Sequence, residues 1–253
     1  MIEAFGITDV GRRRKVNEDA FVQDDGRGFY AVCDGMGGHN AGEVASRMSV
    51  DTMASFIDMT HEQALEDIAW PFGAEPGYSL DANRLRSAIR LANARVSQSS
   101  HEREDYSGMG TTVVALLTNG PTATVAWAGD SRCYLMREGV LSLLTRDDSW
   151  VSAACSEGIL SAEEIERHPM RNIITKAIGA GETIEPAIEE AQLAPGDCLL
   201  LCTDGLHAMI SDEAIHRVWS GAAGIEEAGI RLIDAANEAG GRDTVTVVLL
   251  RHS

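Results

Sequence analysis

The chain has 253 residues, of which 44% are hydrophobic and 24% charged, the composition of an ordinary globular protein that can bury a full core. Its formal net charge of −18 argues against nucleic acid as a partner, because binding a polyanion depends on cationic surface. The sequence has no apolar stretch of the roughly 18 residues that a membrane helix needs, and Glu3 and Asp9 do not suit a signal peptide. We therefore expect a cytoplasmic protein with no membrane partner.

The first half of the chain alternates apolar runs with amphipathic segments. Residues 29–33 and 111–117 are short apolar runs typical of strands. Residues 42–57 and 81–97 place apolar side chains on one stripe, so each predicts a helix, the second with its first aspartate as N-cap. Residues 60–80 are rich in proline and glycine and predict a surface loop.

The middle of the chain contains two more strand-like runs, residues 123–128 and 133–136. They follow the preceding strand without room for a helix, so we expect much of the sheet to be antiparallel. Residues 147–181 mix helix formers with a His-Pro pair and predict a flap.

Towards the C-terminus, residues 198–202 and 244–250 predict strands that flank two helices. A serine caps the first helix, residues 211–219, and a glycine ends the second, residues 225–239. We expect the helices to cover a sheet core, which places the chain in the α+β class. Neither a repeat nor a linker divides it, so residues 1–253 are expected to form one domain.

The cysteines are five in number, scattered, and include no CxxC pair. We expect them to be buried, reduced thiols; zinc binding or a disulfide framework is the alternative.

Four separated segments place an aspartate at the boundary of an apolar run, next to or near a glycine. They are Asp34-Gly35, Gly129-Asp130, Thr203-Asp204-Gly205 and Gly241-Arg242-Asp243. Each alone is a turn signal, but strand ends can also hold side chains at the fixed separation that a metal site requires. Gathered carboxylates repel one another unless cations lie between them, and all-oxygen ligation favours magnesium, manganese or calcium over zinc.

A basic run, residues 12–15, leads directly into Glu18 and Asp19. An arginine fork suits bidentate capture of a phosphate dianion. Either acid could add a metal ligand, directly or through water.

The chain resembles the metal-dependent, type 2C serine/threonine protein phosphatases, in particular their bacterial branch. The resemblance rests on six segments in the family's order: Arg14-Lys15-Val16-Asn17-Glu18-Asp19, Asp34-Gly35-Met36-Gly37-Gly38-His39 with Gly42-Glu43, Gly110-Thr111-Thr112, Gly129-Asp130-Ser131-Arg132, Thr203-Asp204-Gly205-Leu206 and Gly241-Arg242-Asp243. It extends from about residue 6 to residue 250.

The resemblance implies a four-layer α-β-β-α sandwich, two mainly antiparallel sheets flanked by helices. It also implies a set of metal ligands. Asp34 would bridge two cations and the carbonyl of Gly35 would contact one of them. Asp204 and Asp243 would hold the other cation, and Glu18 would act through water.

The family pattern further implies a weaker third metal site at Asp130 with Asp204, hence two or three divalent cations, manganese or magnesium. Arg14 matches the phosphate-binding arginine, and residues 147–181 match a flap beside the active site.

The chain departs from the family pattern at two positions, and one assignment depends on register. Met36 stands where eukaryotic members often have a histidine that is the proposed general acid, which leaves nearby His39 as a candidate proton donor. Thr244 replaces a common asparagine. Lys15 lies beside Arg14, so the cation that reaches the phosphate is assigned from register.

The function implied is metal-dependent hydrolysis of phosphoserine and phosphothreonine in proteins, by direct attack of a water held between two cations. Such an enzyme would oppose a bacterial serine/threonine kinase in signalling. Ser131 is interpreted as a turn hydroxyl and not a nucleophile. Three alternatives remain: a non-catalytic phosphoprotein-binding module, a hydrolase of nucleotides or small phosphate esters, and a structural calcium-binding protein.

Overall fold

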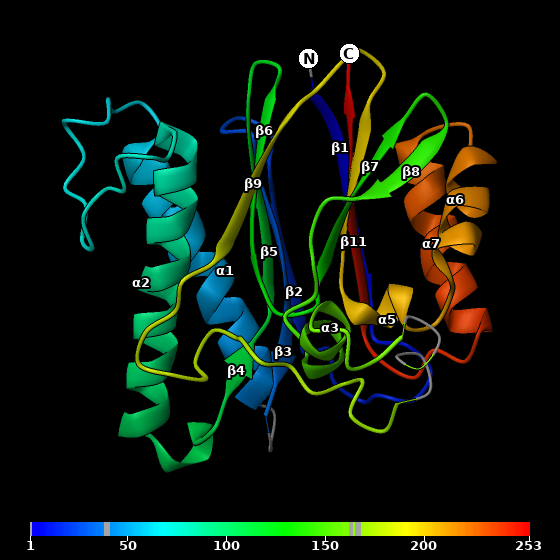
Figure 1. Ribbon diagram of the computed structural model, residues 1–253, viewed down its shortest axis with the longest axis horizontal. Helices are drawn as coiled ribbons and strands as arrows, with labels where there is room; N and C mark the ends of the chain where they lie inside the picture. Colours follow the sequence, from blue (N-terminus) through cyan, green and yellow to red (C-terminus); the bar gives the residue numbers. More distant parts are fainter. Residues whose placement is uncertain (1, 38–40, 162–163, 165–167) are drawn as a thin grey trace.

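The computed structural model describes residues 2–37, 41–161, 164 and 168–253. Two β-sheets pack face to face, and a pair of long helices covers the outer face of each sheet (Figure 1). This is the four-layer α-β-β-α sandwich that the resemblance implied, and the α+β class is confirmed.

The first sheet has the strand order β1-β11-β10-β7-β8 and the second has the order β2-β3-β5-β6-β9, with β4 paired to β3. The first sheet contains β1 (Ile2–Asp9), β7 (Arg132–Arg137), β8 (Val140–Leu143), β10 (Cys198–Cys202) and β11 (Val245–His252). The second contains β2 (Asp19–Asp24), β3 (Phe29–Met36), β4 (Gly110–Thr111), β5 (Val113–Asn119), β6 (Thr122–Ala128) and β9 (Ala187–Gln192). Each of these neighbouring pairs is antiparallel, as expected.

The helices α1 (Ala41–Thr60) and α2 (Leu80–Glu102) cover the second sheet, whereas α6 (Asp212–Ser220) and α7 (Ile225–Glu238) cover the first (Figure 1). Three clusters of buried apolar side chains fill the spaces between the four layers. Among the described residues, the short helical segments η1 (Glu104–Tyr106), α3 (Trp150–Ser156) and α5 (Asp204–His207) lie outside the layers. Within the described residues, no helix combines the length and apolar character that crossing a bilayer requires.

Every strand and long helix expected from the sequence is present, but four strands were missed. They are β1, β2, β8 and β9, whose residues are largely half-buried or exposed and so lack a continuous apolar run. The N-cap expected at Asp81 was wrong. Ser79 caps α2 by accepting a hydrogen bond from the backbone N–H of Ala82, while Asp81 accepts one from Arg84 instead.

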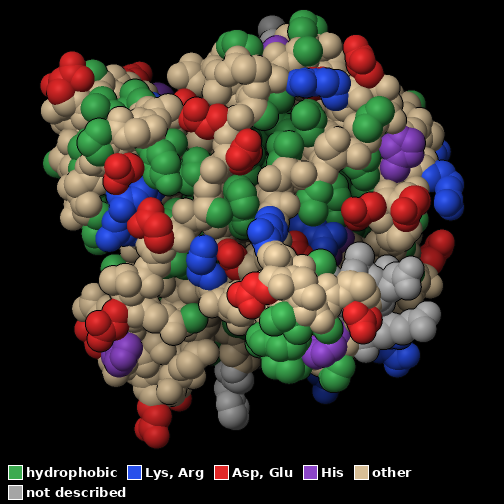
Figure 2. Space-filling model, in the orientation of Figure 1, with side chains coloured by type: hydrophobic (Ala, Val, Ile, Leu, Met, Phe, Trp, Pro, Cys, Tyr) green, Lys and Arg blue, Asp and Glu red, His purple; other side chains and the backbone are tan. Residues whose placement is uncertain are grey.

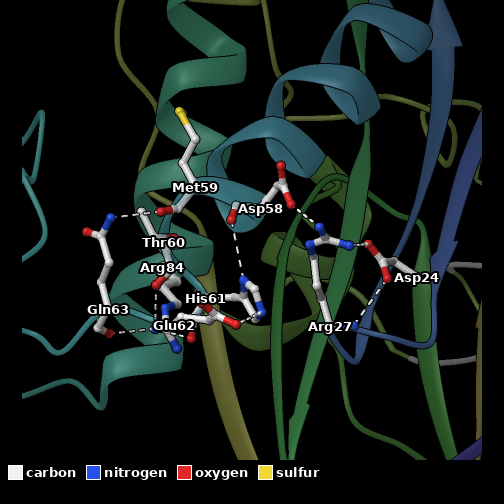
Figure 3. A network of polar contacts seen from close by, with 9 residues as sticks. All are labelled: Asp24, Arg27, Asp58, Met59, Thr60, His61, Glu62, Gln63 and Arg84. Carbon is white, nitrogen blue, oxygen red and sulfur yellow. Dashed lines mark hydrogen bonds and ion pairs between the residues drawn. The ribbon is translucent and has the colours of Figure 1, made fainter.

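Arg84, in α2, binds the C-terminal end of α1 and the loop that follows it (Figure 3). One guanidinium nitrogen donates to the backbone carbonyls of Thr60, His61 and Gln63, at 2.6, 2.9 and 2.9 Å, and the other to Asp81 at 2.8 Å. The last carbonyls of a helix have no partner within the helix, and this buried cation satisfies that of Thr60, the last residue of α1, together with two carbonyls of the loop. Residues 61–79 then form neither helix nor strand, as expected.

The five cysteines are free, and four of them are buried in the apolar layers. The expectation of buried thiols that pack as small hydrophobes is confirmed for these four, whereas Cys155 is only partly buried, and the disulfide alternative was wrong.

Candidate active site

The four aspartates singled out in the sequence lie at one end of the sandwich. Asp34 lies near the end of β3, Asp130 follows β6, Asp204 follows β10 and Asp243 precedes β11. Because neighbouring strands are antiparallel, the ends of three strands and the start of the fourth meet at one edge. In Figure 1 this edge is the lower one, beside α5 and β4 and opposite the two termini.

Several carboxylates act on the pKa of Asp34. Burial raises it well above its usual range, and the negative charges of Asp19, Asp204, Asp130 and Asp243 raise it further. A cation bound among these carboxylates would offset their mutual repulsion and favour the ionised form of Asp34.

The pKa values of Asp204 and Asp130 are raised as well. Burial and the charge of Asp243 raise the pKa of Asp204, and burial with the charges of Asp204 and Asp147 raises the pKa of Asp130 to about 7. The Asp204 Oδ1 atom is buried and, among the described residues, has no hydrogen-bond partner. A buried carboxylate oxygen without a donor is costly, and a divalent cation is the partner that would suit it.

Arg14 is the member of the basic run that reaches this edge. Its guanidinium donates to Asp243 Oδ2 at 2.8 Å and to Glu18 Oε2 at 3.3 Å. The side chain is 46% exposed, so its outer face is open to an incoming anion. Burial raises the pKa of Glu18, while Arg14 lowers it.

Gly35 and Gly205 allow the backbone to pack closely at this edge. A Cβ on Gly35 would lie 2.1 Å from the carbonyl oxygen of Gly42, and one on Gly205 would lie 1.8 Å from the carbonyl oxygen of Thr244. Gly35 also donates its backbone N–H to the carbonyl of Glu18 at 3.1 Å. Only glycine fits at either position, which explains why a glycine follows both Asp34 and Asp204.

Asp19 has a structural role, because three hydroxyl groups hold its carboxylate. It lies opposite Asp34 in the β2–β3 pair and is only 5% exposed. Its carboxylate accepts hydrogen bonds from the hydroxyls of Thr203, Thr244 and Thr246 at 3.0, 2.8 and 2.6 Å. Burial raises the pKa of Asp19 to about 6, and the three hydroxyls oppose that rise. Of the two acids that follow the basic run, Asp19 lies beside Asp34 but is held by three hydroxyls, whereas Glu18 contacts Arg14.

Sequence reasoning missed the polar groups behind Asp130. His207 Nε2 lies 3.0 Å from the carbonyl oxygen of Asp130, and burial lowers the pKa of His207 to about 3, so the ring is neutral. Arg132 holds Asp147 through two hydrogen bonds of 2.9 and 2.8 Å. These contacts join residues from different strands and loops, and their only sequence signal was an arginine directly after the Gly-Asp-Ser turn.

Ser131 is buried and its hydroxyl lies 2.7 Å from that of Thr112. This supports the interpretation of a turn hydroxyl and not of a nucleophile.

A cleft of about 340 Å³ lies beside Asp130 and Asp204. Its far wall contains Arg171 and Asn172, from the segment interpreted as a flap. The described part of residues 147–181 includes α3 and is joined to the body by an isolated bridge between Thr111 and Ile178. Its mobility stays a prediction.

The candidate proton donor His39 lies outside the described residues. The described residues do not include a group of three or more His, Cys, Asp or Glu side chains already close enough to hold a metal ion. The carboxylate of Asp243 forms an ion pair with Arg14. The donor set is nevertheless all oxygen, and the unpartnered Asp204 Oδ1 and the mutual repulsion at Asp34 fit a hard divalent cation.

Comparison with known proteins gives the same family as the motifs. A family model described as Protein phosphatase 2C matches residues 11–238. The chain is 37% identical over 242 residues to the serine/threonine protein phosphatase PstP of Mycobacterium tuberculosis, covering 96% of this chain but only 43% of that protein. It is 35% identical over 248 residues to the protein phosphatase PhpP of Streptococcus pneumoniae, covering 96% of this chain and 95% of the relative.

Among solved structures, the catalytic domain of PstP in complex with two manganese ions matches with a TM-score of 0.83 and 34% identity. The match covers 99% of this chain and 97% of that one. Since both the family model and these relatives match nearly the whole sequence, the chain belongs to the protein phosphatase 2C family.

Proposed function

We propose that this chain removes phosphate from phosphoserine and phosphothreonine in proteins, with two divalent cations held at the aspartate edge. The observation that carries the proposal is the convergence of Asp34, Asp130, Asp204 and Asp243, with one buried Asp204 oxygen lacking a donor among the described residues. The names of the relatives and the two manganese ions in the PstP structure support it.

In this proposal Asp34, the Gly35 carbonyl, Asp204 and Asp243 would hold the two cations, and Glu18 would act through water. Manganese or magnesium suits such oxygen ligands. When bound, the pair supplies an activated water and neutralises charge on the phosphoryl group.

Asp130 would complete a weaker third site with Asp204. Its raised pKa means that a cation there competes with a proton near pH 7. The neutral ring of His207 contacts the backbone carbonyl of Asp130. The nearby charge of Asp147 is paired with Arg132.

Arg14 would bind the phosphate. Its guanidinium lies between Asp243 and Glu18, so a phosphate oxygen would meet a fixed cation at the edge of the metal site. Residues 147–181 would act as a flap over the phosphoprotein, and residues 1–253 would constitute a single catalytic domain. His39 stays a candidate for the proton donor.

Such a substrate must be produced by a serine/threonine kinase, and we propose that this activity opposes one in signalling. We place it in the cytoplasm, because five free thiols suit a reducing compartment.

The test is hydrolysis of para-nitrophenyl phosphate and of a phosphothreonine peptide by chelator-treated protein, titrated with manganese and with magnesium, beside Asp204→Asn. We expect activity that requires metal, that prefers the peptide to a nucleotide, and that is lost in the variant. A folded protein that binds manganese without turnover would instead be a phosphoprotein-binding module or a structural metal protein. A preference for nucleotides would identify a different hydrolase.

A further inference from the structure

Three adjoining hollows run from the aspartate edge to the outer strand of the first sheet. The first is the cleft beside Asp130 and Asp204. The second, about 330 Å³ and beside α3, shares Arg132, Asp147 and two neighbours with the first. The third, about 380 Å³ and between the β7–β8 hairpin and α6, shares Leu143 with the second. We call these three hollows together the track.

The far end of the track is apolar. Val140 is 62% exposed and Leu143 40%, and both line the third hollow together with Leu141. Exposed aliphatic side chains in β8 are unusual, because outer strands normally have charged residues that prevent pairing with other chains. Figure 2 shows hydrophobic side chains beside acidic ones in the region of β8 and α6.

The strand β8 also offers unpaired backbone groups. It is the last strand of its sheet and pairs only with β7 among the described residues. An extended peptide can bind to such an edge by adding a strand, and its alternate side chains then select the pockets.

The rim of the third hollow is acidic. Asp212 accepts a hydrogen bond from the Tyr134 hydroxyl at 2.9 Å and lies 3.7 Å from Arg132, so it is partly neutralised. Glu213 lines the same hollow, and it adds a negative charge in a chain whose net charge is already −18. A second copy of this acidic chain would be repelled there, whereas a basic segment would be attracted.

We propose that the track binds an extended segment of the phosphoprotein substrate. An apolar side chain of that segment fills the hollow between β8 and α6, and an adjacent lysine or arginine lies beside Glu213 and Asp212. The inference rests on the proposed phosphatase activity and adds to it a specificity determinant at a distance from the phosphate. A small aryl phosphate would not reach it.

The test compares Val140→Ser/Leu143→Ser with the parent protein on phosphothreonine peptides. In these peptides an Ile-Arg pair is moved stepwise away from the phosphorylated residue on either side. We expect one placement to be preferred, and kcat/KM for that peptide to fall about tenfold in the double variant. Turnover of para-nitrophenyl phosphate should not change, which also shows that the variant is folded.

A matched control is Met59→Ser/Ile230→Ser, which removes two exposed apolar side chains, 63% and 42% exposed, from α1 and α7. It should leave every peptide rate unchanged. In addition, Glu213→Lys should lower kcat/KM for the Ile-Arg peptide and raise it for an Ile-Glu peptide, because the charge at the rim is reversed.

Direct binding separates a failure of this inference from a failure of the proposed function. The probe is a fluorescent, unphosphorylated Ile-Arg peptide, whose anisotropy is measured with each variant. Binding that is lost in Val140→Ser/Leu143→Ser supports the track even if turnover is absent. Equal rates and equal binding in the double variant would overturn it. Concentration-dependent dimerisation abolished by the same variant would also overturn it, because the occupant would then be a second copy.

Discussion

Asp19 in β2 accepts a hydrogen bond of 2.8 Å from the hydroxyl of Thr244, which directly follows Asp243. The two residues are 225 positions apart in the chain: Asp19 belongs to the second sheet, and Thr244 directly precedes β11 of the first. Thr203, which directly precedes Asp204, donates to the same carboxylate. One buried acid therefore positions the backbone beside two of the proposed metal ligands. This gives a role to Thr244, one of the two positions at which the chain departs from the family pattern.

We expect Thr244→Val to destabilise the protein by about 1.5–3 kcal/mol, because the isosteric change removes one hydrogen bond to a charged group. Manganese affinity should fall as well, because the hydrogen bond from Thr244 to Asp19 no longer fixes the backbone next to Asp243. Urea unfolding and a manganese titration measure the two effects. Thr118→Val, at the other end of the sandwich, is the control, and equal behaviour of both variants would contradict this role.

Asp204→Asn and Asp243→Asn should each lower kcat by more than about 100-fold, since changes to groups that merely support a metal ligand already cost 10- to 100-fold. The fold should be retained, because an amide occupies the same space. Circular dichroism checks the fold, and the thermal shift on adding manganese checks the site. Near-normal turnover by a well-folded Asp243→Asn protein would contradict the metal assignment.

Arg14→Ala should mainly raise KM for a phosphopeptide. The loss of a charge-assisted hydrogen bond costs about 1.5–3 kcal/mol, which corresponds to roughly 10- to 150-fold. Arg14→Lys keeps the charge but loses the fork, so it should recover only part of the effect. An unchanged KM in the alanine variant would exclude phosphate binding by Arg14.

Asp130 should make the stability of the metal-free protein depend on pH. Its folded-state pKa of about 7 lies above its ordinary value of 3.8, so between these values the folded protein holds a proton that the unfolded chain has released. This stabilisation is complete below about pH 4 and is lost as the pH rises through 7. Relative to Asp130→Asn, the parent protein should gain stability as the pH falls from about 8 to 5. Chelator-treated samples unfolded in urea test this, and parallel pH profiles would refute it.

Gly35→Ala should destabilise the protein by about 1–3 kcal/mol or more and displace Asp34, because the added methyl meets the Gly42 carbonyl oxygen at 2.1 Å. Gly77→Ala is the matched control, since a Cβ there meets nothing within 4 Å. Thermal melts with and without manganese compare the two. Equal melts would mean that the close packing at Gly35 can relax.

The sequence alone determined the elements with strong local signals. Continuous apolar runs such as residues 198–202 and one-sided helices such as residues 225–239 predict their structure, because burial on one face or on both requires those periods. The same signals located Asp34, Asp204 and Asp243, since an aspartate at a strand boundary needs only local turn chemistry.

Only the tertiary structure decided which polar groups meet. Strand β1 lacks a clear signal of its own and becomes a strand by pairing along its whole length with β11, at the other end of the chain. The partners of Asp19, the choice of Arg14 over Lys15 and the track beside β8 likewise depend on segments that the fold brings together. Local periodicity has no information on such pairings, because they follow from packing one sheet against the other.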